Sequence, residues 1–232
     1  MELVDIVDEN NQLTGQVEER WVAYDKGLWR RTVSCWILNE KGDVLLQKRA
    51  ANKKKNPNKW AKTGGQVDSG ETVENAISRE VKEELGIEIP KEQIRTIDIH
   101  KCNDTNKRFS YNFIFVVNYK INEYILQKEE VADVKYITIE EMEQIRKNKD
   151  TNYTFCNWSD EDFNREVNWL KNKKDEILNK WKYNFKKWAK TFNKSKVFAH
   201  LSKNLTKGSK RSIIYIGDEN EKRNYISWRI YK

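Results

Sequence analysis

Short runs of apolar and β-branched residues, separated by Gly, Asn and Asp, divide the first 140 residues into strand-like segments. The start, MELVDIVDENNQLTG, predicts a strand that turns at residues 9–11. The segment TVSCWILNEKGDVLLQKRA predicts a hairpin around residues 39–42. The longest aromatic and β-branched run, residues 108–121, predicts a further strand. A strand at residues 134–137 then leads into a short helix at Glu140.

A helical period replaces the strand pattern at residues 73–85. Thr72 can cap the first turn of this helix, and Gly86 can supply the left-handed residue that ends it. The order along the chain is therefore strands, helix, strands, helix. This order predicts a mixed α/β domain.

Three carboxylates of this helix, Glu80, Glu83 and Glu84, fall within an arc of about 100° on one face. Apolar residues lie between them on the same face of the helix, so the pattern predicts that these acids face the core together with the apolar residues. Carboxylates on an inward face repel one another and lose hydration, a cost that a hard divalent cation can offset. The pattern thus predicts a site for Mg²⁺, or for Mn²⁺. The alternative is three surface acids that pair with Lys82 or with other cations.

The surrounding residues fit a longer pattern. Residues 65–87 match G-x5-E-x7-R-E-U-x-E-E-x-G-U, in which U is bulky and aliphatic, without a mismatch. The matched positions are Gly65, Glu71, Arg79, Glu80, Val81, Glu83, Glu84, Gly86 and Ile87. This segment resembles the signature of the Nudix hydrolases, and the resemblance covers about residues 1–170. It implies an α/β/α sandwich in which a mixed sheet lies between helices and the signature loop and helix hold the metal.

The resemblance also implies roles for the signature residues. Glu80, Glu83 and Glu84 would be catalytic metal ligands, and the backbone carbonyl of Gly65, or of the preceding glycine, would be a further ligand. Arg79 would orient a loop carboxylate, which Glu71 would supply as its partner in a buried, bidentate pair. Both residues would support the site.

The general base has two candidate positions. In some Nudix enzymes the first Glu of the R-E pair, here Glu80, takes the proton from water, whereas in others a loop Glu beyond the signature does so. Glu129 and Glu130 are the candidates for such a loop. Two solvated acids before a strand are the alternative for them.

A finer resemblance links the chain to the branch of Nudix proteins that are similar to isopentenyl diphosphate isomerase. The segments that carry it are VDIVDENNQLTG, LWRRTVSCWILNEKGDVLLQKRA and NKWAKTGGQVDSGE. The isomerase proper uses a cysteine in a Cys-Ser-His-Pro segment and metal-binding histidines. The corresponding stretch, AANKKKNPNKW, which ends at Trp60, has neither residue type. Hydrolysis of a pyrophosphate is therefore the expected chemistry.

Cations near the predicted strand ends are candidates for binding substrate phosphates. Lys48 and Arg49 end one strand and Arg30 precedes another, although such positions are often plain surface charges. Four further lysines lie in the loop before the signature: Lys53, Lys54, Lys55 and Lys59. Trp60 follows them and could stack on a base, but packing in the core is the favoured interpretation.

The net charge of +8 hides an asymmetry. Residues 171–232 contain 18 lysines and arginines against 5 acids, a net of +13, whereas residues 1–170 have a net of −5. We therefore divide the chain into a Nudix domain, 1–170, and a basic, aromatic-rich extension, 171–232. The helical spacing that starts from a cap at Ser159 and runs into the extension predicts one or two helices. A hairpin is predicted at residues 213–230. The extension could bind RNA or another polyanion, or pack its aromatic side on the domain, and packing is favoured.

The remaining features limit the class of protein. The three cysteines show no C-x-x-C spacing and only two histidines are present, so reduced thiols are expected and a zinc site is not. The start is acidic and no apolar run approaches eighteen residues, which predicts a cytoplasmic protein with no membrane partner.

The predicted activity is metal-dependent hydrolysis of a nucleoside triphosphate, or of a nucleoside diphosphate linked to another group. The small-molecule substrate would be a nucleotide or another diphosphate. The alternative is an enzyme that removes pyrophosphate or a cap from RNA, or a protein that binds nucleotide or RNA, through the basic extension. Neither the substrate nor the oligomeric state follows from the sequence.

Overall fold

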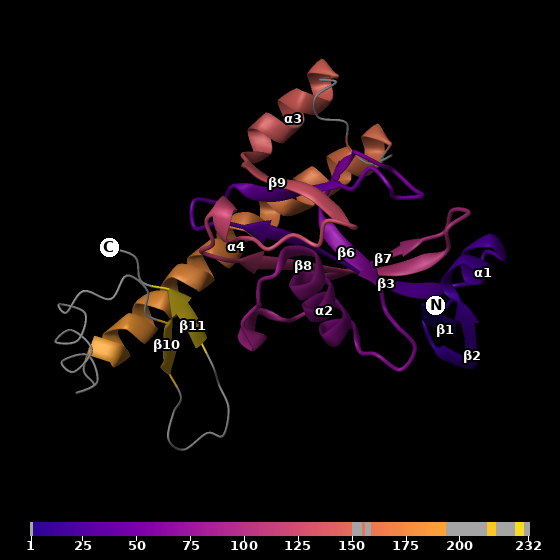
Figure 1. Ribbon diagram of the computed structural model, residues 1–232, viewed down its shortest axis with the longest axis horizontal. Helices are drawn as coiled ribbons and strands as arrows, with labels where there is room; N and C mark the ends of the chain where they lie inside the picture. The colour runs from indigo at the N-terminus through magenta and orange to yellow at the C-terminus, as the bar shows by residue number, and fades with distance from the viewer. Residues whose placement is uncertain (1, 150–154, 156–158, 194–212, 217–225, 230–232) are drawn as a thin grey trace. The chain divides into compact units, whose positions relative to one another are not determined.

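The computed structural model describes residues 2–149, 155, 159–193, 213–216 and 226–229, with side chains described as far as residue 184 (Figure 1). The chain divides into two compact units, Met1–Leu178 and Asn179–Lys232. The division falls inside one long helix, eight residues beyond the boundary at 170 that charge and resemblance suggest.

A mixed sheet of seven strands forms the centre of the first unit. Its strands are β3 (Arg30–Leu38), β4 (Val44–Arg49), β5 (Trp60–Ala61), β6 (Thr63–Gln66), β7 (Asp98–Cys102), β8 (Arg108–Val116) and β9 (Val131–Ile137). β3 and β8 run parallel along their whole length, and the other pairs are antiparallel. Every β-rich run that the sequence pattern predicts is a strand, and the predicted α/β class is confirmed.

The predicted hairpin at residues 39–42 is only partly correct. The turn forms, with Gly42 N donating to Asn39 O at 3.0 Å, but β3 and β4 pair only at Leu38 and Val44. Beyond the turn β4 pairs with β9, while β3 pairs with β6 and β8. The local sequence specifies the turn, but the partner of each strand depends on segments far along the chain.

A small hairpin precedes the sheet and confirms the predicted turn at residues 9–11. β1 (Leu3–Val7) pairs with β2 (Leu13–Glu19), and Asn11 has the positive φ of 67° that such a turn requires. The short helix α1 (Arg20–Asp25) follows directly. Its Ala23 packs with Val4 and Ile6 in a separate small core.

Helix α2 (Val73–Leu85) begins and ends where its capping residues predict. The Thr72 side chain accepts a hydrogen bond from Asn75 N, and Gly86 is left-handed with φ 67°. The helix at Glu140 is also confirmed: α3 (Ile139–Asn148) begins with a capping box between Thr138 and Glu141. Two short 3₁₀ turns, η1 (Lys91–Gln93) and η2 (Ile121–Glu123), lie in the connections.

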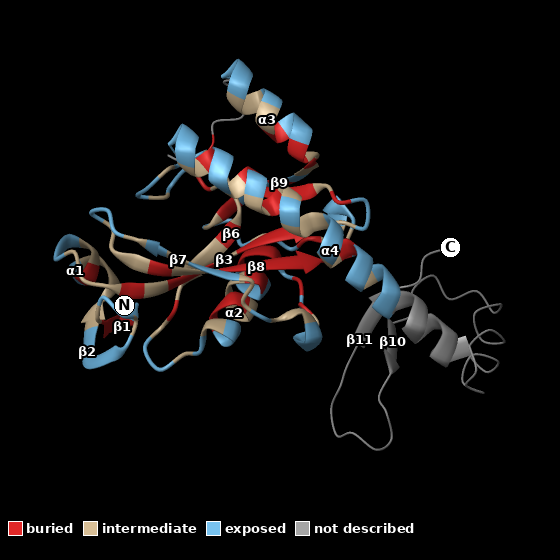
Figure 2. Ribbon diagram, turned by 180° about the vertical axis from the view of Figure 1, so that it is seen from behind, coloured by how far each residue is buried: buried red, intermediate tan, exposed pale blue. Residues whose placement is uncertain are grey.

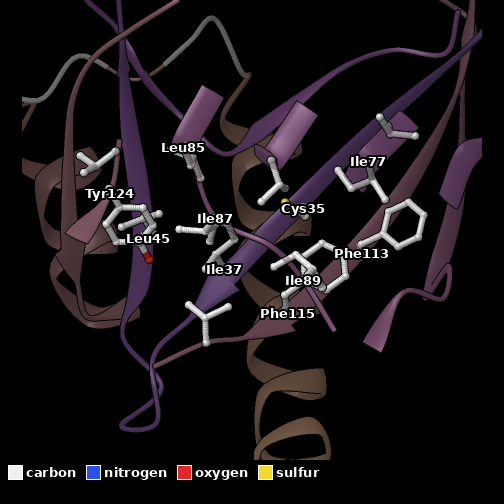
Figure 3. Close-up of a cluster of buried hydrophobic side chains, with 14 of the residues drawn as sticks. Cys35, Ile37, Leu45, Ile77, Leu85, Ile87, Ile89, Phe113, Phe115 and Tyr124 are labelled. Carbon is white, nitrogen blue, oxygen red and sulfur yellow. The ribbon is translucent and has the colours of Figure 1, made fainter. Parts of the chain in front are cut away.

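The two faces of the sheet meet different helices because side chains alternate along a strand. On β3, Val33, Cys35 and Ile37 point into the main core (Figure 3). They pack there with the buried apolar residues of α2, which are Ala76, Ile77, Val81 and Leu85. Trp36, which points to the opposite face, donates from Nε1 to Glu166 of the last helix at 3.3 Å. The sheet is thus covered on both faces, as the α/β/α prediction requires.

The C-terminal spacing predicts one or two helices, and the structure has one, α4 (Asp160–Asn193). Ser159 caps it, since its Oγ accepts from Asp162 N at 3.0 Å. Its buried positions recur along one side, as the red bands in Figure 2 show; they are Phe163, Val167, Leu170 and Leu178. This helix packs on the first unit as far as Leu178. The predicted packing of the aromatic side of the extension stays a prediction, since the side chains of Phe185 and Trp188 lie outside the described residues.

The second unit contains the predicted hairpin. β10 (Ile213–Ile216) pairs antiparallel with β11 (Ile226–Arg229), with Ile213 opposite Arg229. The predicted limits at residues 225 and 230 lie outside the described residues.

Candidate functional site

The loop between β6 and α2 is held by one arginine. Arg79 donates from Nε to Glu71 Oε1 at 3.1 Å and from Nη2 to Glu71 Oε2 at 3.0 Å, the bidentate geometry that the sequence predicts. The same Nη2 donates to the backbone carbonyl of Gln66 at 3.1 Å. Arg79 therefore ties the middle of the helix to the end of β6 and to the loop between them.

Arg79 also contacts two carboxylates of its own helix. Its Nη1 lies 2.9 Å from Glu80 Oε1 and 3.3 Å from Glu83 Oε2. Burial opposes the charge on Arg79, but the hydrogen bond that it donates to Glu71 and the charges of Glu80 and Glu71 outweigh burial, so the pKa of Arg79 lies above its ordinary value. One guanidinium thus organises three acids.

The three signature carboxylates do not all face inward. Glu84 is 6% exposed and the side chain of Glu80 is 13% exposed, whereas the side chain of Glu83 is 52% exposed. The sequence prediction was therefore wrong for Glu83. The physical reason is its place at the edge of the 100° arc, on the side that turns toward solvent.

Burial changes the acidity of the two inward carboxylates. It raises the pKa of Glu80 to about 7, against the opposing effect of the Arg79 charge. It raises the pKa of Glu84 to about 8, opposed by a hydrogen bond from Gln47 and assisted by the charges of Glu80 and Glu130. Both acids lose hydration in the fold, and each would gain from a nearby cation.

The residues present fit a hard divalent cation. Within the described part of the chain, no three His, Cys, Asp or Glu side chains are already arranged to hold a metal ion. However, Glu80 and Glu84 are desolvated oxygen donors one helical turn apart, with Glu83 beside them. Carboxylate oxygens are the ligands that Mg²⁺ and Mn²⁺ prefer, so the chemistry of this donor set suits the predicted metals.

The backbone at Gly65 lies directly against Glu80. A Cβ atom at Gly65 would be 2.1 Å from Glu80 Oε1 and 2.3 Å from its Cδ. The neighbouring Gly64 is restricted differently, since its Cβ would lie 2.3 Å from the backbone oxygen of Val33. The signature glycine is therefore needed for the close approach of the carboxylate to the strand.

We expect Gly65→Ala to displace Glu80 while the protein still folds. Because the added methyl group meets the end of a flexible side chain, the loss of unfolding free energy should stay near about 1–2 kcal/mol. Displacing a ligand should weaken Mn²⁺ binding about ten- to a hundredfold, measured by calorimetric titration. Gly64→Ala is the contrasting variant, because its clash is with backbone and should mainly reduce stability. Unchanged Mn²⁺ affinity in Gly65→Ala would contradict this account.

A buried amide holds Glu84, and the sequence analysis missed it. Gln47 on β4 is 3% exposed and donates from Nε2 to Glu84 Oε2 at 2.8 Å. Its Oε1 accepts from Thr63 Oγ1 at 2.8 Å, which fixes which end of the amide faces the carboxylate. The available signal was a polar residue in the otherwise apolar start of the strand, VLLQ.

The loop that carries the base candidates is attached to the end of α2. Ile125 N donates to Leu85 O at 3.0 Å, and Gln127 N donates to Glu84 O at 3.1 Å. Glu130 is half-buried, forms an ion pair with Lys53 and helps to raise the pKa of Glu84. Glu129 is exposed. The geometry therefore brings Glu130, and not Glu129, to the signature carboxylates.

Two of the residues predicted to bind substrate, Arg30 and Trp60, are buried in the fold. Arg30 is 3% exposed and donates from Nε to Gln66 Oε1 at 3.0 Å, with further bonds to Asn106 Oδ1 and Lys107 O. Burial lowers its pKa to about 10. The prediction that it reaches phosphate was wrong, because this buried network uses its donors. Trp60 is 5% exposed, so core packing, the favoured alternative, accounts for it and stacking on a base does not.

The other two cations remain near the site. Arg49 lowers the pKa of Glu84 through its charge, and its Nε donates to Lys55 O at 3.1 Å. Lys48 is half-buried on β4, opposite Trp60 and Asp133 in the ladder. Arg49 is thus the better placed of the two for a substrate phosphate.

Two of the three cysteines, Cys35 and Cys102, lie in the described part of the chain. Cys35 and Cys102 are free thiols, and burial raises the pKa of Cys35 above its ordinary range; Cys156 lies outside the described residues. None of the helices in the described ranges combines the length and the apolar composition of a membrane span.

Comparison with known proteins gives consistent matches. Residues 28–158 match the NUDIX domain family. An uncharacterized Nudix hydrolase of Listeria monocytogenes is 36% identical over 155 residues, which cover 63% of this chain and 85% of the relative. The nucleoside triphosphatase NudI of an Enterobacter species is 31% identical over 135 residues, 54% of this chain and 94% of the relative.

Two further matches are to a protein named as an isopentenyl-diphosphate isomerase and to a crystal structure with the same fold. Isopentenyl-diphosphate Delta-isomerase 2 of Photorhabdus laumondii is 27% identical over 155 residues, 66% of this chain and 86% of the relative. The crystal structure of DR0079 from Deinococcus radiodurans superposes with a TM-score of 0.54 at 24% identity, covering 66% of this chain and 93% of that one. The second match shows the same fold.

Proposed function

Since this chain belongs to the Nudix family, whose hydrolases act on phosphoric anhydrides, we propose that it cleaves the diphosphate linkage of a nucleotide with the help of a divalent metal. The substrate would be a nucleoside triphosphate or a nucleoside diphosphate linked to another group. The similarity to a nucleoside triphosphatase supports a nucleotide.

One observation carries this proposal. Two buried carboxylates, Glu80 and Glu84, are held by Arg79 and Gln47 on the inward side of α2, and a third acid, Glu130, lies beside them. Ionising these desolvated carboxylates costs free energy, and a bound cation would offset that cost. The same cation would neutralise the charge of a diphosphate.

The metal would be held by Glu80, Glu83 and Glu84, with the Gly65 carbonyl as a further ligand. When bound, Mg²⁺ or Mn²⁺ supplies charge for the diphosphate oxygens and makes a water more acidic. The role of the protein residues is positional. Arg79 fixes Glu80 and the loop, and Gln47 fixes Glu84 with one oxygen directed at its amide.

Glu130 is the candidate base that the geometry favours over Glu129. It is half-buried next to Glu84, and its ion pair with Lys53 holds it at the site. Glu80 is the other candidate, because a carboxylate whose pKa lies near neutrality can both accept and release a proton. Lys53 and Arg49 would contact the substrate phosphates.

Hydrolysis is favoured over isomerisation by the residues present. The chain resembles an isomerase in the surrounding sequence, but the stretch before the signature contains neither cysteine nor histidine. Its Cys35 is buried, with a raised pKa, and is a poor source of a proton. The water-attack reaction needs only carboxylates and a metal.

The proposal is tested by measuring nucleotide and phosphate release from a panel of substrates. The panel contains nucleoside triphosphates, nucleoside diphosphate sugars, dinucleoside polyphosphates and triphosphorylated RNA, each with Mg²⁺, with Mn²⁺ and with EDTA. We expect release of nucleoside monophosphate from at least one small nucleotide, and loss of activity in EDTA. Turnover of RNA alone would favour the RNA-directed alternative. No turnover, or turnover that persists in EDTA, would overturn the proposal.

A further inference from the structure

A cluster of cations and rings forms where the lysine loop meets helix α1. Trp21 and Tyr24 of α1 are half-exposed and their ring centroids are 6.2 Å apart. Lys54 Nζ lies 4.5 Å from the Trp21 ring, and Lys55 Nζ lies 3.1 Å from the Tyr24 ring and 5.4 Å from the Trp21 ring. We call Trp21, Tyr24, Lys54 and Lys55 the cation–aromatic cluster.

The cluster holds more positive than negative charge. Two further cations face these rings: Arg20 lies 4.8 Å from the Trp21 ring and is paired with Glu2, and Arg30 lies 5.6 Å from the Tyr24 ring. The acid that precedes α1, Glu19, uses its carboxylate to cap the helix. Across the described residues, neither Lys54 nor Lys55 forms an ion pair. Two ammonium groups held against one indole repel each other, and an anion between them would relieve that repulsion.

The lysine loop connects this cluster to the candidate site. Lys53 forms the ion pair with Glu130, and the backbone oxygen of Lys55 accepts from Arg49. Both Glu130 and Arg49 act electrostatically on Glu84. The loop that carries the cluster is therefore attached to two residues that act on a signature carboxylate.

We propose that Lys54 and Lys55, positioned by the rings of Trp21 and Tyr24, form a second phosphate site that binds substrate phosphates beyond the cleaved linkage. This inference rests on the proposed function and narrows it. The enzyme would prefer substrates that carry at least one phosphate outside the cleaved anhydride. Rings position the ammonium groups while leaving N–H donors for phosphate oxygens, so the site needs no buried counter-charge.

The test uses inorganic tripolyphosphate and the full chain in EDTA, so that hydrolysis cannot contribute. Because the chain has nine tryptophans and a basic extension, the readout must be local. Fluorotryptophan labelling and fluorine NMR provide it, with the Trp21 resonance assigned by its loss in Trp21→Phe. We expect a saturable shift of this resonance in the wild type. In Lys54→Gln/Lys55→Gln the midpoint should rise by about tenfold or more, as expected for lost charged hydrogen bonds.

Two variants complete the design. Lys54→Arg/Lys55→Arg keeps the charge and should stay near the wild-type midpoint, and so should the control Lys41→Gln/Lys147→Gln, which neutralises two exposed lysines outside the cluster. An unshifted Trp21 resonance in the wild type, or an unchanged midpoint in Lys54→Gln/Lys55→Gln, would overturn the inference. Binding that is intact in a protein that hydrolyses nothing would instead overturn the proposed function.

Discussion

Replacing Glu80 with Gln should lower kcat/KM by about a thousandfold at pH 7.5 with saturating Mg²⁺. Gln has the shape of Glu, but it has no charge to offer a cation and cannot take a proton from water. Glu80 is the acid that touches both Arg79 and the close glycine backbone, so its loss removes a ligand from the centre of the proposed site. Steady-state release of nucleotide from whichever substrate the panel identifies measures the effect.

Glu88→Gln is the matched control. Glu88 lies just beyond the same helix, is largely exposed and pairs only with Lys82 among the described residues, so its activity should stay within twofold of the wild type. The same assay compares Glu130→Gln with Glu129→Gln, of which only the former should lose activity. Wild-type turnover in a folded Glu80→Gln protein would remove this residue from the mechanism.

The metal-free protein should lose stability as the pH rises from 5 to 8.5, and Glu84 should be a main cause. Burial raises the pKa of Glu84 to about 8, so between its ordinary value of 4.5 and 8 the folded state keeps a proton that the unfolded state has released. Stability therefore falls with rising pH over this window. The contribution of Glu84 is on the order of a few kcal/mol, and Glu80, with a pKa of about 7, adds to it.

Urea unfolding in EDTA at several pH values measures this effect. Glu84→Gln removes the titrating group, so it should match the wild type near pH 5 and be more stable at pH 8.5. Mg²⁺ should reduce the difference at high pH, since it binds the ionised folded state. Glu88→Gln should keep the wild-type slope. Equal slopes in the wild type and Glu84→Gln would show that Glu84 is not desolvated as the structure describes.

Features set by neighbours along the chain were predictable. Thr72 and Gly86 limit α2 because a cap and a left-handed residue act within one turn, and Thr138 limits α3 in the same way. The Arg79–Glu71 pair was predicted from the resemblance to the Nudix signature, and the structure has it. The turn at residues 39–42 is a further local case, although the strands that leave it separate.

Features set by tertiary packing were not predictable in the same way. Arg30 and Trp60 lie near strand ends, where the sequence pattern is compatible with an exposed side chain that binds substrate. In the structure both side chains are buried. Glu83 lies at the edge of its arc, where a few degrees decide between core and solvent. Gln47 on β4 bonds Glu84 on α2, and Thr63 on β6 bonds Gln47, and no local pattern specifies these contacts.

The attachment of the base loop to the last carbonyls of α2 makes the site tolerant of changes in length. Ile125 and Gln127 are anchored to the helix end, so the position of Glu130 depends on the few residues after Gln127. The preceding residues 118–123 are mostly exposed. We expect insertions there to change the surface beside the loop while Glu84 and Glu130 keep their positions, because the two backbone hydrogen bonds to the end of α2 lie between the insertion and Glu130.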